Sequence, residues 1–421
     1  MGDKSKPIFS RWLGPVLAGK LSKPYVHILF GARQTGKSTL LRSLLPPDTL
    51  QVNLADPRER ARHMADPEEF IKLCKAFPQK TAPAYVFVDE AQSVPSLFDA
   101  VQYLYDEDKR RWRFILCGSS ARRLRRTGAN LLPGRSLYHK LHGLTLLERP
   151  ADMDPKTISP PLLPFQWSGN APERSSFPEA DLLTRLAYGE LPGIVLAEER
   201  DRADLLETYA LVHLEEEIRR ESLVKDWGAF LRFLRFAAAE SGQILNYAGI
   251  SQETGLSKPT VAAYYQLLED MFIGFLVPAY GKSPRKNLLS TPRFYFFDLG
   301  VRHASAGLTP SRDIPRVDGG RVFEQWVGLE LWKRIQYLGK GQLFHFRTKD
   351  GAEIDFVLEF GGTLIPIEVK WTERPSLKDS RHLRSFLAEN PTRAPHGYII
   401  CRCPRPLALS ERITALPWFG F

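Results

Sequence analysis

The sequence has few cysteines, no long apolar run and no zinc-binding pattern. Four cysteines among 421 residues are too few for a disulfide framework, which favours a reducing compartment. No stretch approaches the roughly 18 apolar residues of a transmembrane helix, and the first residues lack the apolar core of a signal peptide. The nine histidines form no H-E-x-x-H or similar cluster, so zinc is not expected. These absences predict a cytoplasmic protein with no membrane partner.

The composition is that of a folded protein, with 43% hydrophobic and 25% charged residues. The net charge of +10 is unevenly placed. Basic residues exceed acidic ones in residues 1–150 and 251–421, whereas acidic residues exceed basic ones in residues 151–250. This pattern favours two anion-binding parts around an acidic helical connector. Ordinary solvated surfaces are the alternative.

Local patterns divide the chain into three predicted domains. Short apolar runs at residues 25–30 (YVHILF), 84–89 (AYVFVD) and 113–117 (RFILC) alternate with helical segments, which is typical of buried parallel strands in an α/β sheet. Residues 150–178 are rich in Pro and Ser and form a boundary. We therefore expect domains at residues 1–150, 180–310 and 318–421.

The strongest motif is GARQTGKS at residues 31–38, which fits G-x-x-x-x-G-K-[ST] between a predicted strand and helix. Its glycines let backbone N–H groups surround phosphate oxygens, and the helix N-terminus adds a positive dipole end. Lys37 would neutralise the β- and γ-phosphates of ATP, and Ser38 would ligate Mg²⁺.

Two acidic residues support the same site. Asp89 and Glu90 end the apolar run AYVFVD, where one carboxylate can hold Mg²⁺ while the next polarises water. After the following run, Ser119 and Ser120 are placed to contact the γ-phosphate or the attacking water. We thus predict ATP contacts from the P-loop and its two neighbouring strands: Gly31, Gln34, Thr35, Gly36, Lys37, Ser38, Thr39, Asp89 and Ser119.

The segments GARQTGKST, YVFVDEAQ and ILCGSSARRL followed by LLPGRS resemble prokaryotic AAA+ ATPases whose C-terminal half is a PD-(D/E)XK nuclease-like domain. The resemblance implies that Asp89 and Glu90 are the Walker B pair and that Ser119 or Ser120 is sensor-like. It further implies that Arg135 is an arginine finger, supplied in trans in a homo-oligomer; a structural salt bridge is the alternative. The intervening arginines are interpreted as DNA contacts or a solvated helix face: Arg122, Arg123, Arg125 and Arg126.

The middle of the chain has a helix–turn–helix pattern followed by a basic hairpin. We expect helices at residues 246–254 and 258–272, with Ser257 as N-cap, and then strands FLVPAY and RFYFF around the loop at residues 281–290. This is the winged-helix pattern, whose second helix enters the DNA major groove. The predicted groove contacts are Lys258, Thr260 and Tyr264, and the predicted phosphate contacts are Lys282, Arg285 and Lys286. The same fold also serves as a packing or protein-contact module.

A second set of charged residues lies near the C-terminus. AEIDFVLE (352–359) and TLIPIEVKW (363–371) read as adjacent strands, and alternation puts Glu353, Asp355 and Val357 on one strand face. Asp355 followed by Glu368-x-Lys370 resembles the PD-(D/E)XK core. Asp355 and Glu368 would hold Mg²⁺ or Mn²⁺, Lys370 would orient or deprotonate water, and Glu324 would add a ligand from the preceding helix. The alternative is a surface strand pair with a simple Glu–Lys ion pair.

The expected fold class is therefore α/β: an AAA+-type P-loop sheet, a helical and winged-helix middle, and a restriction-endonuclease-like C-terminal domain. Two functions fit these features. In the first, the protein hydrolyses ATP and cleaves DNA, with Glu90, Arg135, Asp355, Glu368 and Lys370 as catalytic residues. In the second, ATP gates a regulatory switch that binds nucleic acid or a protein partner without cleaving.

Overall fold

The computed structural model describes residues 9–78, 83–119, 132–149, 179–220, 224, 226–281, 291–348 and 350–420. Several residues with predicted contacts lie outside these ranges, so their contacts remain predictions: Ser120, Arg122, Arg123, Arg125, Arg126, Lys282, Arg285 and Lys286. The chain forms two compact units, one within residues 9–144 together with 270–273 and the other from residue 145 onward.

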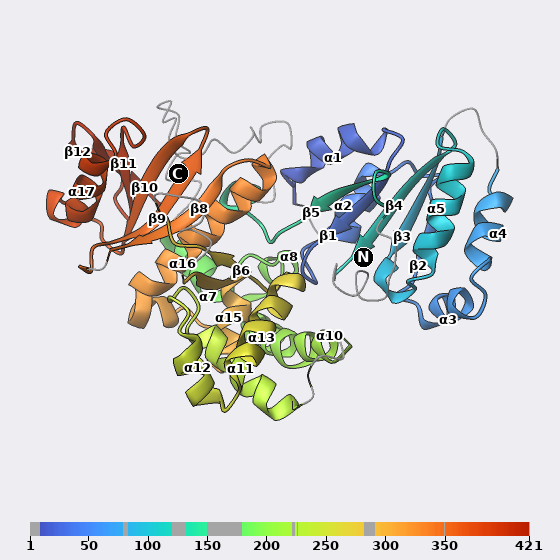
Figure 1. The fold of residues 1–421 in the computed structure, drawn as a ribbon, viewed down its shortest axis with the longest axis horizontal. Helices are drawn as coiled ribbons and strands as arrows, with labels where there is room; N and C mark the ends of the chain where they lie inside the picture. Colours follow the sequence, from blue (N-terminus) through green and yellow to red (C-terminus); the bar gives the residue numbers. More distant parts are fainter. Residues whose placement is uncertain are drawn as a thin grey trace. The chain divides into compact units, whose positions relative to one another are not determined.

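The first unit is a five-stranded parallel sheet in the order β2-β3-β4-β1-β5 (Figure 1). The strands are β1 (Val26–Phe30), β2 (Leu50–Asn53), β3 (Ala84–Asp89), β4 (Trp112–Gly118) and β5 (Ser136–Lys140). The three predicted strands are thus confirmed as β1, β3 and β4. The helices are α1 (Leu13–Leu21), α2 (Lys37–Leu44), α3 (Pro57–Ala65), α4 (Glu69–Ala76) and α5 (Leu97–Glu107).

Helices cover both faces of this sheet, which is why its strands read as continuous apolar runs. Side chains of α4 and α5 pack with Ile28, Val86 and Phe114 on one face. Side chains of α1 and α2 pack with Leu29 and Ile115 on the other face. The carboxyl ends of β1, β3 and β4 therefore open at one edge of a rigid, buried scaffold.

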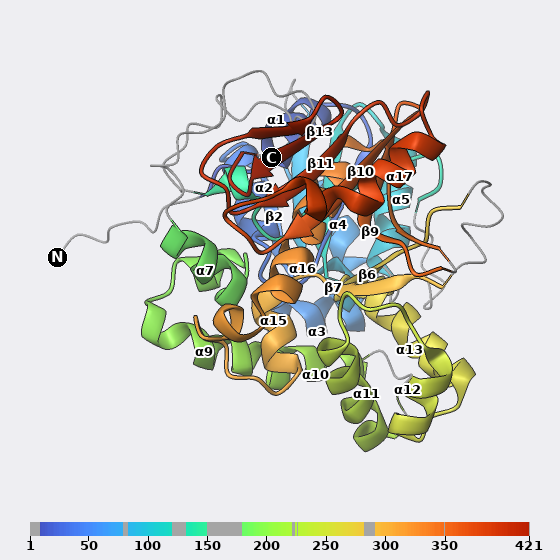
Figure 2. The same ribbon diagram turned by 90° about the vertical axis from the view of Figure 1, so that its left-hand side faces the viewer.

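The second unit begins with η2 (Leu146–Glu148) and a series of helices. They are α7 (Glu179–Tyr188), α8 (Pro192–Val195), α9 (Glu199–Thr208), the π-helical η5 (Tyr209–His213), α10 (Leu214–Arg220), α11 (Trp227–Ala239), α12 (Tyr247–Thr254), α13 (Lys258–Asp270) and α15 (Leu299–Ser305). Figure 2 shows α11, α12 and α13 grouped together. The predicted helix–turn–helix elements are confirmed as α12 and α13, with Gly255 in the left-handed conformation at the end of α12 (φ 72°).

A two-stranded antiparallel ribbon follows α13. It consists of β6 (Gly274–Val277) and β7 (Arg293–Phe296), and both strands are mostly buried. Phe275 stacks on Trp332 with ring centroids 4.0 Å apart, and Tyr295 contacts Phe356. The ribbon therefore shares one core with the C-terminal sheet and its long helix.

The C-terminal part is a six-stranded mixed sheet in the order β12-β13-β11-β10-β9-β8 (Figure 1). Its strands are β8 (Gln342–Arg347), β9 (Glu353–Phe360), β10 (Thr363–Lys370), β11 (Gly397–Cys401), β12 (Leu407–Ser410) and β13 (Ile413–Pro417). Helix α16 (Ile314–Leu338) packs on one face, and α17 (Arg381–Glu389), preceded by η6 (Leu377–Ser380), packs on the other. Within the described ranges, no helix is both long and apolar enough to cross a bilayer.

Candidate functional site

The P-loop lies between β1 and α2, where the sequence places it. Gly31 follows the last residue of β1, and Lys37 is the first residue of α2. The ammonium group of Lys37 donates hydrogen bonds to the carbonyls of Gly31 and Ala32, both at 2.9 Å. The positive charge is thus held inside the curve of the loop, beside the N–H groups of the first turn of α2.

Close backbone packing explains the glycines of this loop. A Cβ atom on Gly31 would lie 2.1 Å from the carbonyl oxygen of Leu141, and Gly36 has φ 90°. Thr35 is buried and donates to the Ala32 carbonyl at 2.9 Å, whereas Gln34 and Thr39 are exposed. Gly31 is therefore required where the end of β1 packs against the backbone after β5, and the left-handed Gly36 turns the loop into α2, a curvature that fits a bound phosphate chain.

Asp89 and Glu90 lie at the carboxyl end of β3, next but one to β1 in the sheet. Asp89 is 8% exposed, and its carboxylate lies 3.7 Å from the guanidinium of Arg42 on α2. Ser38 in the first turn of the same helix is half-buried. The donor set of one hydroxyl and one carboxylate suits Mg²⁺, which is usually held by few protein ligands plus substrate phosphates.

Two residues that the sequence reasoning missed brace this site. Arg11 is buried and donates to the carbonyls of Thr35, at 2.7 Å, and His142, at 2.5 Å. Gln92 follows β3 and donates to Glu90 at 2.6 Å and to Ser119 at 3.2 Å. An arginine in the segment before a P-loop and a glutamine after two acidic residues carry no local pattern that predicts these contacts.

Arg135 does not belong to this site within its own chain. It directly precedes β5, whose Ser136 pairs with Val26 at the start of β1, whereas the P-loop follows the end of β1. The four residues of rise along β1 separate the two ends by about 13 Å. Arg135 instead donates to the carboxylate of Asp106 at 2.8 Å. Within its own chain Arg135 thus forms the salt bridge that is its alternative role, and its role as an arginine finger supplied in trans stays a prediction.

The C-terminal constellation of charged residues is brought together by three elements. Asp355 lies on β9, Glu368 and Lys370 on β10, and Glu324 on α16. Lys370 donates to Glu368 at 2.8 Å, and Asp355 lies close enough for its charge to act on Glu368. Asp355 also accepts the backbone N–H of Val369 at 2.8 Å, which places its carboxylate level with the sheet backbone.

Burial and mutual repulsion shape the charges of this cluster. Burial, then the charge of Asp355, raises the pKa of Glu368 to about 8 and that of Glu324 to about 7. Although burial opposes its charged form, the neighbouring Asp355 and Glu368 raise the pKa of Lys370 above its ordinary value. Lys370 is therefore a cation at neutral pH, which suits orienting water or phosphate and not removing a proton.

A bulge in β9 corrects one detail of the predicted strand faces. The pairing with β8 shifts between Phe344 and Phe346, opposite residues 354–357 of β9. Ile354 and Val357 both pack in the core beside α17. Glu353 consequently points to the α16 side, where it pairs with Arg293. The expectation that Glu353 and Val357 share a face is therefore wrong, because the extra residue reverses the alternation.

Arg293, on the ribbon strand β7, is a further residue that the sequence did not reveal. It is 5% exposed and donates to Glu324 at 2.7 Å as well as to Glu353. Glu324 thus already has a cationic partner. In the described part of the chain, no three His, Cys, Asp or Glu side chains form a ready-made cage for an ion. The carboxylates of Asp355 and Glu368, on neighbouring strands, still fit Mg²⁺, which one or two carboxylates commonly bind together with substrate phosphate.

The second helix of the helix–turn–helix differs from its prediction in one residue. Ser257 accepts the backbone N–H of Thr260, as expected of an N-cap, and Lys258 is exposed. Tyr264, in contrast, is 7% exposed and packs edge-on against Phe230 of α11, with ring centroids 4.9 Å apart. The prediction that Tyr264 faces a DNA groove is wrong, because helical spacing places it on the apolar face of α13.

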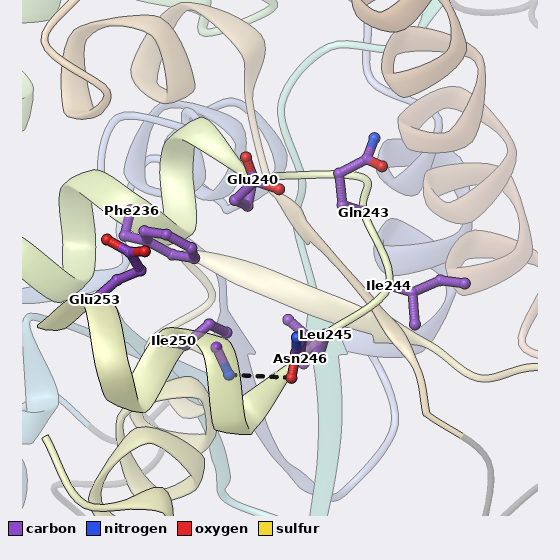
Figure 3. A pocket seen from close by; sticks show the side chains of 9 residues that line it. Phe236, Glu240, Gln243, Ile244, Leu245, Asn246, Ile250 and Glu253 are labelled. Atoms are coloured by element: carbon purple, nitrogen blue, oxygen red, sulfur yellow. Dashed lines mark hydrogen bonds between the residues drawn. The ribbon is translucent and has the colours of Figure 1, made fainter.

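A pocket of about 300 Å³ lies between α11 and α12 (Figure 3). Phe236, Ile244 and Ile250 contribute apolar side chains, and the carboxylates of Glu240 and Glu253 lie at its edge. Carboxylates repel nucleic-acid phosphates. This side of the helix pair is therefore not suited to bind a phosphate backbone.

The parallel sheet, the P-loop cradle and the acidic end of β3 define a P-loop NTPase-type domain. Comparison with known families agrees, because residues 23–149 match an AAA domain. This match supports ATPase activity of residues 23–149, and an AAA-type ATPase uses ATP and usually Mg²⁺. Residues 179–312 and 319–420 match two domains of unknown function, DUF8612 and DUF4143.

Relatives match along most of the chain. Uncharacterized proteins of Mycobacterium tuberculosis and Mycobacterium bovis are each 24% identical over 372 residues, covering 88% of this chain and 75% of the relative. An uncharacterized protein of Haemophilus influenzae is 22% identical over 363 residues, covering 82% of each chain. A solved structure, protein VC1899 from Vibrio cholerae, aligns over 91% of this chain and 90% of its own, with 12% identity and a TM-score of 0.18.

Proposed function

We propose that this protein hydrolyses ATP and acts on DNA, and that its C-terminal sheet carries a metal-dependent phosphodiester-cleaving site. The observation that carries the second part is the convergence of Asp355, Glu368 and Lys370 on neighbouring strands, with the lysine hydrogen-bonded to Glu368 at 2.8 Å. Buried charges of this kind cost free energy unless they share a purpose.

The roles of the residues follow from their chemistry. Asp355 and Glu368 would hold Mg²⁺, or Mn²⁺ in its place; when bound, the ion supplies Lewis-acid polarisation of the phosphate. Lys370, charged and fixed by Glu368 at 2.8 Å, neutralises negative charge that develops on the phosphate oxygens. Glu324 accepts a hydrogen bond from Arg293 on one carboxylate oxygen, and the other would be the ligand expected from the preceding helix.

DNA contact by the winged-helix segment is part of this proposal. Lys258 and Thr260 are accessible at the start of α13, the end of a recognition helix that reaches base edges in helix–turn–helix proteins. The acidic pocket between α11 and α12 lies on a part of the segment that would face away from phosphates. Assembly into a homo-oligomer is the remaining expectation, and size in solution with and without an ATP analogue tests it.

A cleavage assay tests the proposed nuclease site. Purified protein with ATP and either Mg²⁺ or Mn²⁺ is incubated with single- and double-stranded DNA. We expect cleavage that Asp355→Asn and Lys370→Met each lower by about 100-fold or more, while ATP hydrolysis stays within twofold. Glu359→Gln, on the same strand but in a surface pair with Arg393, is the matched control and keeps cleavage. Cleavage that persists in both site variants would exclude this site.

One observation favours the second function, an ATP-gated switch that binds without cleaving. Arg293 already neutralises Glu324 and Glu353 in the site, as expected of a carboxylate cluster kept for structure. In that case wild-type protein binds DNA or a protein partner in an ATP-dependent manner and shows no cleavage with either metal. Nucleotide-dependent gel-shift measurements on the same DNA substrates separate the two functions.

A further inference from the structure

Gln92 connects two parts of the nucleotide site through one side chain. It lies in the 3-10 turn Ala91–Ser93 that follows β3, and it is 5% exposed. Its amide nitrogen donates to the carboxylate of Glu90 at 2.6 Å and to the hydroxyl of Ser119 at 3.2 Å. Both hydrogens of the amide are thus directed at residues expected to act on the γ-phosphate or the attacking water.

The orientation of this amide is fixed by chemistry. An ionised carboxylate only accepts hydrogen bonds, so the nitrogen and not the oxygen of Gln92 must face Glu90. The amide oxygen has no hydrogen-bond partner in the described part of the chain. A buried polar atom without a partner costs free energy, so the amide keeps both donated hydrogen bonds at the expense of one at its oxygen.

The backbone around Gln92 leaves room for this contact alone. A Cβ atom on Gly118, the last residue of β4, would lie 2.4 Å from the amide oxygen of Gln92. Glu90 has a left-handed backbone conformation (φ 57°), which turns the chain sharply after β3. Gly118 and the turn at Glu90 therefore allow the amide to bridge the carboxyl ends of two neighbouring strands.

The topology places this bridge beside the P-loop. In the sheet order, β4 lies between β3, which carries Asp89 and Glu90, and β1, which leads into the P-loop. Ser119 directly follows β4. The Gln92 amide consequently joins the Glu90 carboxylate, which is expected to accept a proton from water, to the Ser119 hydroxyl at the end of β4.

We propose that Gln92 is a positioning residue for ATP hydrolysis, which holds the Glu90 carboxylate by one oxygen and presents the other to the attacking water. This inference rests on the proposed ATPase function. Because Oε2 of Glu90 accepts from Gln92, Oε1 is the atom that takes the proton. The hydrogen bond from Gln92 to Ser119 fixes the position of the Glu90 carboxylate relative to the end of β4.

Steady-state ATP hydrolysis by full-length Gln92→Leu tests the proposal. We expect kcat to fall by about 10- to 100-fold, the range for losing a residue that orients a catalytic group, with KM for ATP within threefold. Gln92→Asn, too short to reach both partners, lowers kcat less. In a double-mutant cycle with Glu90→Gln, the loss caused by Gln92→Leu should largely disappear, because Gln92 acts through the Glu90 carboxylate. Gln51→Leu, at an exposed position on β2, is the control and leaves kcat unchanged.

The outcomes that overturn the proposal are distinct. If wild-type protein hydrolyses ATP and both Gln92 variants keep kcat within twofold, the positioning role is excluded while the ATPase function stands. If Gln92→Leu and Glu90→Gln reduce kcat independently, with effects that multiply, a role of Gln92 through the Glu90 carboxylate is excluded. If wild-type protein does not hydrolyse ATP, the proposed function itself fails, and Gln92 has no reaction to position. Should Gln92→Leu unfold, Gln92→Asn decides the question.

Discussion

The nucleotide loop and the C-terminal carboxylate cluster are suited to opposite charges, and the chain builds them differently. The loop is made of consecutive residues, and its recognition groups are backbone N–H groups plus one ammonium. The cluster is made of side chains from α16, β7, β9 and β10, and it contains buried acids held beside Arg293 and Lys370. In the nucleotide loop, a mutation can remove binding without lowering stability. In the carboxylate cluster, each charge proposed to act in the reaction also contributes to the stability of the fold.

The largest effect is expected at Arg293. Arg293 is buried, whereas Glu324 and Glu353 are partly exposed, so Arg293→Leu should lower the free energy of unfolding of the second unit by about 3 kcal/mol, the lower end for breaking a buried pair. Urea denaturation measures it. Arg393→Leu, which breaks the more exposed pair with Glu359, should cost less than about 1 kcal/mol. Equal losses in the two variants would show that the cluster does not depend on buried charge.

At the nucleotide loop, the expected effect is on function alone. Lys37→Ala removes the charge that faces the phosphates and should lower ATP hydrolysis by about 10²- to 10³-fold. The midpoint of urea denaturation should hardly change, because Lys37 bonds only to carbonyls of its own loop. A phosphate-release assay and a denaturation curve on the same preparation check both parts. Loss of stability comparable to that of Arg293→Leu would remove the contrast between the sites.

The pH dependence of stability should come from the cluster. The folded-state pKa values of Glu368, about 8, and Glu324, about 7, lie above the ordinary value of 4.5, so the folded state binds protons that the unfolded state releases. Without divalent ions, stability should fall from about pH 5 to pH 8, by about 1.4 kcal/mol per pH unit for each such proton. Denaturation curves across this range measure the slope, which Glu368→Gln should reduce. A flat profile would contradict it.

The smallest effect is expected at Arg135. Its pair with Asp106 is about one-third exposed on both sides, so Arg135→Ala should cost less than about 1 kcal/mol and leave ATP hydrolysis within twofold. Asp106→Ala serves as the matched variant and should behave in the same way. A large loss of hydrolysis in Arg135→Ala alone, growing with protein concentration, would instead indicate an arginine finger supplied in trans.

Contiguous features were predictable from the sequence. The strands β1, β3 and β4, the helix α2 and the loop between them follow from apolar runs and one glycine-rich motif, because each signal lies within a few residues. The helix–turn–helix followed for the same reason, through Ser257 and Gly255. Tyr264 was misplaced because an aromatic residue with a hydroxyl is compatible with either face of a helix, and only its packing against Phe230 decides.

The cluster was predictable only in part. Alternation along two strands brought Asp355, Glu368 and Lys370 into one prediction, but a bulge in β9 places Val357 on the face opposite Glu353. Arg293 lies 31 residues from Glu324 and 60 from Glu353, so no local pattern pairs them. Gln92 is close to Glu90 in sequence, yet its contact with Ser119 exists only because β3 and β4 are neighbours.

The sequence by itself determined the phosphate loop, the acidic end of β3 and the identity of the residues that could bind a metal, because propensity, glycine geometry and charge are local properties. The tertiary structure decided which of those charges meet. It placed Arg135 at the far end of the sheet beside Asp106, gave Glu324 a cationic partner on a ribbon, and joined Glu90 to Ser119 through Gln92. Long-range pairing of this kind depends on strand order and packing, which no short stretch of sequence encodes.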